Sequence, residues 1–241
     1  KLDGSNPVLM TGYGGFNIGE SPRWSAFAAA WLDLGGTYVL TNLRGGSEFG
    51  ETWHRGGMLG NKQHTFDDFV ACGEWLVAHH YCTPAKLAIM GGSNGGLLVG
   101  AAMTQRPDLF GAVLCQVPLL DMLRYQRFLV ARFWVPEYGS AENAAQYAWL
   151  KAYSPYQHLA AGTAYPPVMF VSGDSDTRVD PLHARKMAAR MQALGGPNPV
   201  LLHYDVASGH SNGRSVDKTI EDSADNVQFL RWQLGMATPQ R

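Results

Sequence analysis

A serine set among glycines is the feature of this chain with the most chemical content. Residues 90–96 read Met-Gly-Gly-Ser-Asn-Gly-Gly, a Gly-x-Ser-x-Gly pattern centred on Ser93. An apolar run of strand length, residues 86–90, precedes it, and a small, apolar stretch of helical character, residues 97–105, follows it. A sharp strand-to-helix turn keeps a serine hydroxyl clear of the sheet, and it needs glycines because larger neighbours would collide. The segment therefore predicts a nucleophilic serine; the plain alternative is a glycine-rich turn with a chance serine.

A serine nucleophile needs a histidine as base, and the histidine needs a carboxylate to orient it. In a parallel sheet these residues belong on loops at the carboxyl ends of later strands. The strand-like run 167–172 is followed by Asp174 and Asp176, and the run 200–206 is followed by His210. The order serine, acid, histidine is that of α/β-hydrolases. The residues alone leave the acid open between the two aspartates, either of which could instead cap a turn, and the histidine could be a solvated loop residue.

The elements that must position these residues alternate along the chain. Strands are expected at 8–10, 37–43, 86–90, 111–117, 167–172 and 200–206. Helices are expected from Pro22 to a stop at Gly35-Gly36, from Thr65 onward, and at 97–105, 181–194 and 217–234. Ser21-Pro22 predicts the start of the first helix, and Thr65 with Asp68 resembles a capping box. Residues 119–165 are expected to form short helices and loops. Continuous apolar strands are typical of a parallel sheet covered on both faces, so one doubly wound α/β domain over residues 1–241 is predicted.

Composition narrows the class of protein. The 241 residues are 46% hydrophobic with a net charge of -1, which argues against a nucleic-acid or membrane-surface partner. No apolar run reaches the ~20 residues that span a bilayer.

The three cysteines, Cys72, Cys82 and Cys115, fit neither a zinc site nor a disulfide framework. Cys72 and Cys115 are expected to be buried. No metal or organic cofactor is expected. A cytoplasmic location is expected. Because residue 1 is Lys and not Met, the sequence does not settle whether a targeting signal precedes it, and a periplasmic or secreted location stays an alternative.

Five segments together resemble the prolyl oligopeptidase family, over nearly all of the chain. They are Gly-Tyr-Gly-Gly-Phe at 12–16, Asn-Leu-Arg-Gly-Gly-Ser-Glu-Phe-Gly at 42–50, Gly-Gly-Ser-Asn-Gly-Gly-Leu-Leu at 91–98, Gln-Arg-Pro-Asp-Leu-Phe-Gly at 105–111, and Asp-Thr-Arg-Val-Asp-Pro-Leu-His at 176–183. Asn94, directly after the serine, is the discriminating detail, because oligopeptidase B, the acylaminoacyl peptidases and dipeptidyl peptidase IV tend to carry other residues there.

The resemblance implies an α/β-hydrolase fold and a serine endopeptidase that cleaves short peptides after proline. It implies Ser93 as nucleophile, His210 as base and Asp176 as the orienting acid. It also implies an oxyanion hole made by the Tyr13 hydroxyl and the backbone N–H of Asn94.

The resemblance further implies a pocket for the substrate proline. Trp134 would stack on the proline ring, and Arg178 would hold the substrate chain on the amino side of the scissile bond. The remaining lining would be Phe16, Leu119, Val179 and Tyr138. From the residues alone, Trp134 could be core packing, Arg178 a surface ion-pair partner, and Tyr13 a turn residue.

The chain also departs from the family pattern. It lacks the β-propeller that precedes this part and screens substrates by size, and it begins inside the hydrolase domain, so an exposed sheet edge is expected. Thr177 stands where the family often has a second Asp, and Ser211-Asn212 follows the histidine where small glycine-rich residues are common. The expected partners are proline-containing oligopeptides and a propeller of the same protein. The alternatives are a peptidase or esterase of other specificity, and an inactive domain used for binding or assembly.

Overall fold

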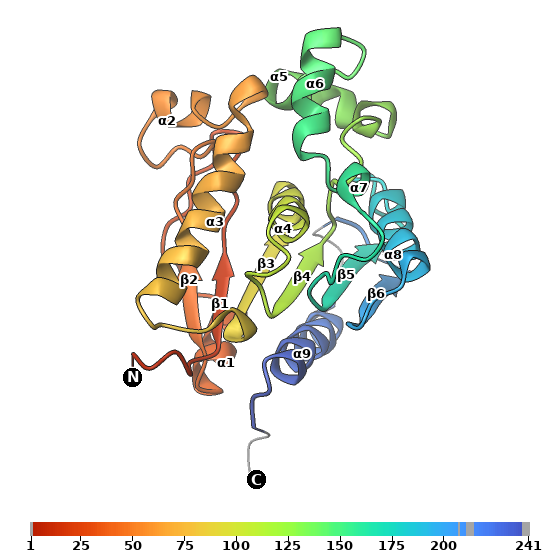
Figure 1. Cartoon of the computed structure of the whole chain (residues 1–241). Coiled ribbons are helices and arrows are strands. Elements are labelled where there is room, and N and C mark those ends of the chain that lie inside the picture. Colours follow the sequence, from red (N-terminus) through yellow and green to blue (C-terminus); the bar gives the residue numbers. More distant parts are fainter. Residues whose placement is uncertain (1, 207, 211–214, 238–241) are drawn as a thin grey trace.

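The computed structural model of the chain describes residues 2–206, 208–210 and 215–237. Within them, a parallel sheet of six strands forms the centre, in the order β2-β1-β3-β4-β5-β6 (Figure 1). The strands are β1 Val8–Thr11, β2 Thr37–Leu40, β3 Leu87–Gly92, β4 Ala112–Gln116, β5 Val168–Gly173 and β6 Val200–Asp205. The expected strands are all present, and β2 is shorter than the sequence suggested.

Helices cover both faces of this sheet, which explains why its central strands β1, β3, β4 and β5 are mostly apolar and buried (Figure 1). In β1, Val8 and Met10 face the larger core, which also holds side chains of α3 (Gln63–Ala78), α4 (Asn94–Gln105) and α8 (Leu182–Leu194). Leu9 faces the opposite core, with Trp31 of α1 (Ala26–Asp33) and Phe229 of α9 (Val216–Gln233). The doubly wound α/β arrangement predicted from the sequence is therefore confirmed.

Short elements gather beyond the carboxyl ends of the strands. In Figure 1, α2 (Glu51–Arg55), α5 (Val135–Tyr138) and α6 (Ala144–Tyr153) lie past the arrowheads of the sheet. The expected series of short helices in 119–165 is present: besides α5 and α6 it holds η3 Tyr125–Arg127, η4 Ala131–Trp134 and α7 Pro155–His158. Two further short 3₁₀ segments are η1 Leu59–Asn61 and η2 Pro84–Lys86.

The predicted start of the first helix at Ser21-Pro22 is wrong. Helix α1 begins at Ala26, after Ser25 in extended conformation. The Ser25 hydroxyl accepts a hydrogen bond from the backbone N–H of Ala28 at 3.3 Å. Both serines are acceptable N-cap residues, and the structure uses the later one.

The predicted capping box at Thr65 and Asp68 is also wrong. Helix α3 begins at Gln63, so both residues lie inside it. The Thr65 hydroxyl donates to the carbonyl of Arg44 at 2.7 Å, and Asp68 accepts from the backbone N–H and side chain of Arg44. These side chains fasten a distant loop to the helix, and this use prevails over local capping.

The three cysteines are free thiols. Cys115 is buried, as expected, but Cys72 is only half-buried on α3, while Cys82 is buried. Within the part of the chain that the structure describes, no helix is long and apolar enough to cross a membrane.

Candidate active site

Ser93 occupies the sharp turn between β3 and α4. Its backbone has φ 58° and ψ −118°, a conformation that side-chain-bearing residues rarely adopt and that is often found at functional sites. The turn closes because its neighbours lack side chains: a Cβ at Gly91 would overlap the carbonyl of Gly95, and one at Gly95 would lie 2.9 Å from the carbonyl oxygen of Gly12. The strand, turn and helix expected around Ser93 are therefore all present.

Asp176 and His210 form a direct pair on the loops after β5 and β6. His210 Nδ1 lies 2.7 Å from Asp176 Oδ2. The other carboxylate oxygen, Oδ1, accepts the backbone N–H groups of Arg178 and Val179, both at 2.9 Å. The buried carboxylate is thus fixed by its own loop, with one oxygen left for the histidine.

The structure discriminates between the two aspartates that the sequence left open. Asp174 is exposed and accepts a hydrogen bond from the Ser175 hydroxyl at 2.8 Å. It is Asp176 that meets His210, which agrees with the role implied by the resemblance.

Ser93 and His210 line one pocket of about 360 Å³, together with Tyr13, Val117 and Arg178. Among the described residues no hydrogen bond joins the Ser93 hydroxyl to the His210 ring; in unliganded enzymes such bonds often tighten only when substrate binds. If Nδ1 donates its proton to Asp176, Nε2 remains as the basic nitrogen of the ring. The pocket therefore holds the two groups that a proton transfer from serine to histidine requires.

Two hydrogen-bond donors lie beside Ser93. Burial raises the pKa of Tyr13 above its ordinary value, and a hydrogen bond with the Ser93 side chain acts in the opposite direction. The phenol therefore keeps its proton near neutral pH and is available as a donor. Asn94 is the first residue of α4, where backbone N–H groups have no acceptor within the helix. Both donors can stabilise negative charge on an oxygen bound at Ser93.

The Asn94 side chain has a second use that the sequence did not reveal. Its Nδ2 donates to the carbonyl of Tyr13 at 2.6 Å, and its Oδ1 accepts from the Tyr138 hydroxyl at 2.7 Å. Asn94 thereby connects the loop of Tyr13 to α5.

Aromatic rings from two distant segments meet beside the pocket. Phe16 packs edge-on against Trp134, with ring centroids 6.4 Å apart, and against Tyr138 at 5.4 Å. The Arg178 guanidinium lies 5.9 Å from the centre of the Trp134 ring. Phe16, Trp134, Tyr138 and Arg178 are thus brought together, and Trp134 belongs to the larger core, as do the buried Leu119, Val179 and Tyr138. The part of these last three in lining a substrate pocket stays a prediction.

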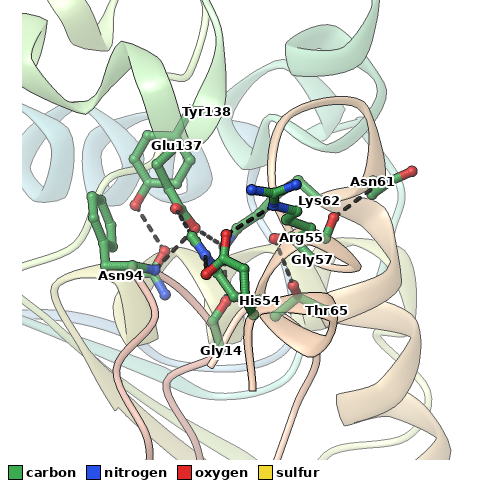
Figure 2. A network of polar contacts seen from close by, with 12 residues as sticks. Gly14, His54, Arg55, Gly57, Asn61, Lys62, Thr65, Asn94, Glu137 and Tyr138 are labelled. Atoms are coloured by element: carbon green, nitrogen blue, oxygen red, sulfur yellow. Dashed lines mark hydrogen bonds and ion pairs between the residues drawn. The ribbon is translucent and has the colours of Figure 1, made fainter. Parts of the chain in front are cut away.

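Sequence reasoning missed a buried polar cluster next to these rings (Figure 2). Lys62 Nζ lies 3.6 Å from Glu137 Oε1, and His54 Nε2 lies 2.9 Å from Glu137 Oε2. Glu137 lies 83 residues beyond His54 in the chain, and a single sequence carries no local signal that links it to His54 and Lys62. Among the described residues, no group of three or more His, Cys, Asp and Glu side chains is arranged to hold a metal ion.

Comparison with known proteins agrees with this geometry. The chain is 42% identical over 238 residues to a prolyl endopeptidase of Elizabethkingia miricola, which covers 98% of this chain and 34% of that protein. It is 40% identical over 232 residues to a prolyl endopeptidase of Dictyostelium discoideum, covering 94% of this chain and 30% of that protein. The chain therefore spans about a third of the length of the curated relatives that it matches.

Solved structures agree as well. A structure from a study of two prolyl endopeptidases superposes with a TM-score of 0.96 at 50% identity, covering 98% of this chain and 35% of that one. A post-proline cleaving enzyme from Rickettsia typhi superposes with a TM-score of 0.95 at 38% identity, covering 98% of this chain and 34% of that one. The fold is that of the α/β-hydrolase catalytic domain in these proteins. Residues 22–237 match the profile described as prolyl oligopeptidase family, and the chain belongs to that family.

Proposed function

We propose that this chain is the catalytic domain of a serine endopeptidase that hydrolyses short peptides on the carboxyl side of proline. The observation that carries the proposal is one pocket lined by a strained serine, a half-buried tyrosine and a carboxylate-held histidine: Ser93, Tyr13 and His210. The printed names of the relatives, prolyl endopeptidases and a post-proline cleaving enzyme, support the substrate class.

In the proposed reaction, His210 Nε2 takes the Ser93 hydroxyl proton as the serine oxygen attacks the carbonyl carbon of the substrate proline. The Tyr13 hydroxyl and the Asn94 N–H bind the oxyanion of the tetrahedral intermediate. His210 then gives its proton to the leaving amine, and the C–N bond breaks to leave an acyl-enzyme on Ser93. Water, deprotonated by His210, hydrolyses the ester and restores the serine hydroxyl.

Asp176 acts through His210 in this scheme. Its Oδ2 accepts the Nδ1 proton, which directs the basic nitrogen of the ring away from the carboxylate and stabilises the imidazolium that forms. The two backbone N–H bonds to Oδ1 keep the carboxylate from turning away.

The preference for proline is proposed to come from the aromatic group beside the pocket. Proline has an apolar ring and no backbone N–H, so flat apolar walls suit it better than hydrogen-bond donors or charges. Trp134 and Phe16 supply such walls, and the exposed Arg178 beside Trp134 can donate hydrogen bonds to a carbonyl of the substrate chain. Since the chain covers about 34% of its relatives, we also propose a β-propeller elsewhere in the same protein as its partner and size filter.

The test uses the purified full-length protein and combines labelling of the active serine with a comparison of cleavage rates on different substrates. A fluorophosphonate probe should label the parent at Ser93 and leave Ser93→Ala unlabelled. Peptides with proline, alanine or arginine before a chromogenic leaving group should be cleaved fastest with proline. If another residue or a simple ester were cleaved faster than the proline peptide, the proposed substrate class would be wrong. A folded parent that takes no label would indicate a binding module.

A further inference from the structure

The loop from Gly12 to Phe16, which carries Tyr13, is held by buried side chains from three other segments (Figure 2). Each of these side chains bonds to a different backbone group of the loop. The contacts are Asn94 Nδ2 to the Tyr13 carbonyl (2.6 Å), Lys62 Nζ to the Gly14 carbonyl (2.8 Å), and the Phe16 N–H to Glu137 Oε1 (3.0 Å). The path of this loop is therefore set by groups outside it.

Lys62 and Glu137 are unusual among these groups because both are ionisable and buried, with 1% and 5% of their surface exposed. Glu137 holds Lys62 through one carboxylate oxygen and His54 through the other. His54 continues the cluster to Glu51 on the surface, at 3.3 Å from Nδ1. Burial lowers the pKa of Lys62 to about 8, although Glu137 opposes the shift.

A cluster of this kind is a poor way to stabilise a fold. Replacing a buried ion pair by apolar residues of similar volume is often neutral or stabilising. The bonds of Lys62 and Glu137 to the loop therefore point to a use in setting its geometry. Gly15 shows how close the fit is: a Cβ there would lie 2.7 Å from Asn94 Nδ2 and 2.9 Å from Lys62 Nζ.

We propose that Lys62 and Glu137 are positioning residues of the oxyanion hole. They fix the backbone that follows Tyr13, at Gly14 and Phe16, and so hold the Tyr13 hydroxyl against Ser93. This rests on the proposed function, in which that hydroxyl binds the oxyanion. A donor of this kind contributes most when it is held in place before charge develops, and a displacement of about 1 Å can cost about a hundredfold in rate.

A double-mutant cycle tests the proposal in the purified protein with its complete natural chain. The parent, Lys62→Met, Tyr13→Phe and the double variant are compared by kcat and KM on a post-proline chromogenic peptide, and by the fluorophosphonate labelling rate per folded molecule. Tyr13→Phe should lower kcat about a hundredfold, as removal of one oxyanion donor does. Lys62→Met should lower kcat about tenfold or more with KM near the parental value.

The coupling between the two residues decides the outcome. If Lys62 acts through the Tyr13 hydroxyl, Lys62→Met should cost less than about threefold once that hydroxyl is gone. The same factor in both backgrounds, or a parental kcat in Lys62→Met, would overturn the proposal. A purely structural lysine would lower the folded fraction equally in both backgrounds and leave kcat per labelled site unchanged.

A second pair of variants covers the case in which Lys62→Met does not fold. Glu137→Gln keeps an acceptor for the Phe16 N–H, whereas Glu137→Ala removes it, so Gln should retain several-fold more of the labelling rate than Ala. Equal rates for the two would count against the proposal. Lys186→Met is the matched control, because Lys186 pairs with Asp121 at 2.5 Å outside the pocket and should keep the parental rate per site.

The two proposals fail separately. A parent that is labelled at Ser93 but prefers another residue over proline removes the substrate class, while the cycle is still read from labelling rates. A labelled parent with an additive cycle removes only the positioning role, and a folded parent without labelling overturns both.

Discussion

Asp176→Asn tests how a single oxygen atom sets the protonation of His210. Oδ1 of Asp176 accepts two backbone N–H groups, from Arg178 and Val179, and Oδ2 faces His210 Nδ1. An amide of the same shape must keep its carbonyl oxygen on the two backbone donors, because its NH₂ group cannot accept a hydrogen bond. The NH₂ group is then turned toward His210 and donates to Nδ1. The ring proton moves to Nε2, the nitrogen that must accept the serine proton.

The expected loss follows from this geometry. Reversing the amide would restore the correct tautomer but leave two backbone N–H groups without their acceptor, at about 1–3 kcal/mol each where they are buried. The wrong tautomer therefore dominates. In serine peptidases with this triad, the same change lowers kcat about 10⁴-fold, which corresponds to roughly 5.5 kcal/mol of barrier at 1.36 kcal/mol per tenfold.

The assay measures kcat on the post-proline chromogenic peptide, with thermal unfolding to establish that each variant is folded. Asp174→Asn is the matched control, because Asp174 is exposed two residues away and bonds to Ser175; it should stay within about twofold of the parent. A folded Asp176→Asn protein with more than a tenth of the parental kcat would refute the tautomer argument. So would an equal loss in the control.

Three further outcomes are expected. Trp134→Ala should reduce the preference for proline over alanine about 10- to 100-fold, seen in the ratio of kcat/KM values, because it removes an aromatic wall beside Phe16. Trp31→Ala should lower the free energy of unfolding by about 3–5 kcal/mol in urea titrations, because this indole is fully buried and donates to the Thr37 carbonyl. Burial lowers the pKa of Lys62 from 10.5 to about 8. Between pH 8 and pH 10.5 the unfolded chain therefore binds more protons at Lys62 than the folded chain does, so the contribution of Lys62 to the free energy of unfolding rises with pH. Urea titrations should show this rise in the parent and its loss in Lys62→Met.

Much of the scaffold could be predicted because its signals are local. Apolar runs of strand length between helix-like runs indicate a covered parallel sheet, and each predicted strand is present. The glycines around Ser93 predicted its turn, since only residues without side chains fit there. The helix starts at Ser21 and Thr65 were wrong, because several residues near each start can cap a helix, and tertiary contacts such as Thr65 to Arg44 decide which role a side chain takes.

The sequence by itself determined the order of the strands along the chain, the turn at Ser93, and which loops carry an aspartate and a histidine. Only the tertiary structure decided which polar groups meet across those loops: Asp176 with His210, Asn94 with the Tyr13 carbonyl, and Lys62 with Glu137. The physical reason is the range over which each kind of interaction acts. Propensity and periodicity act over a few neighbouring residues, whereas a hydrogen bond between distant segments depends on packing that brings a donor atom and an acceptor atom within about 3 Å of each other.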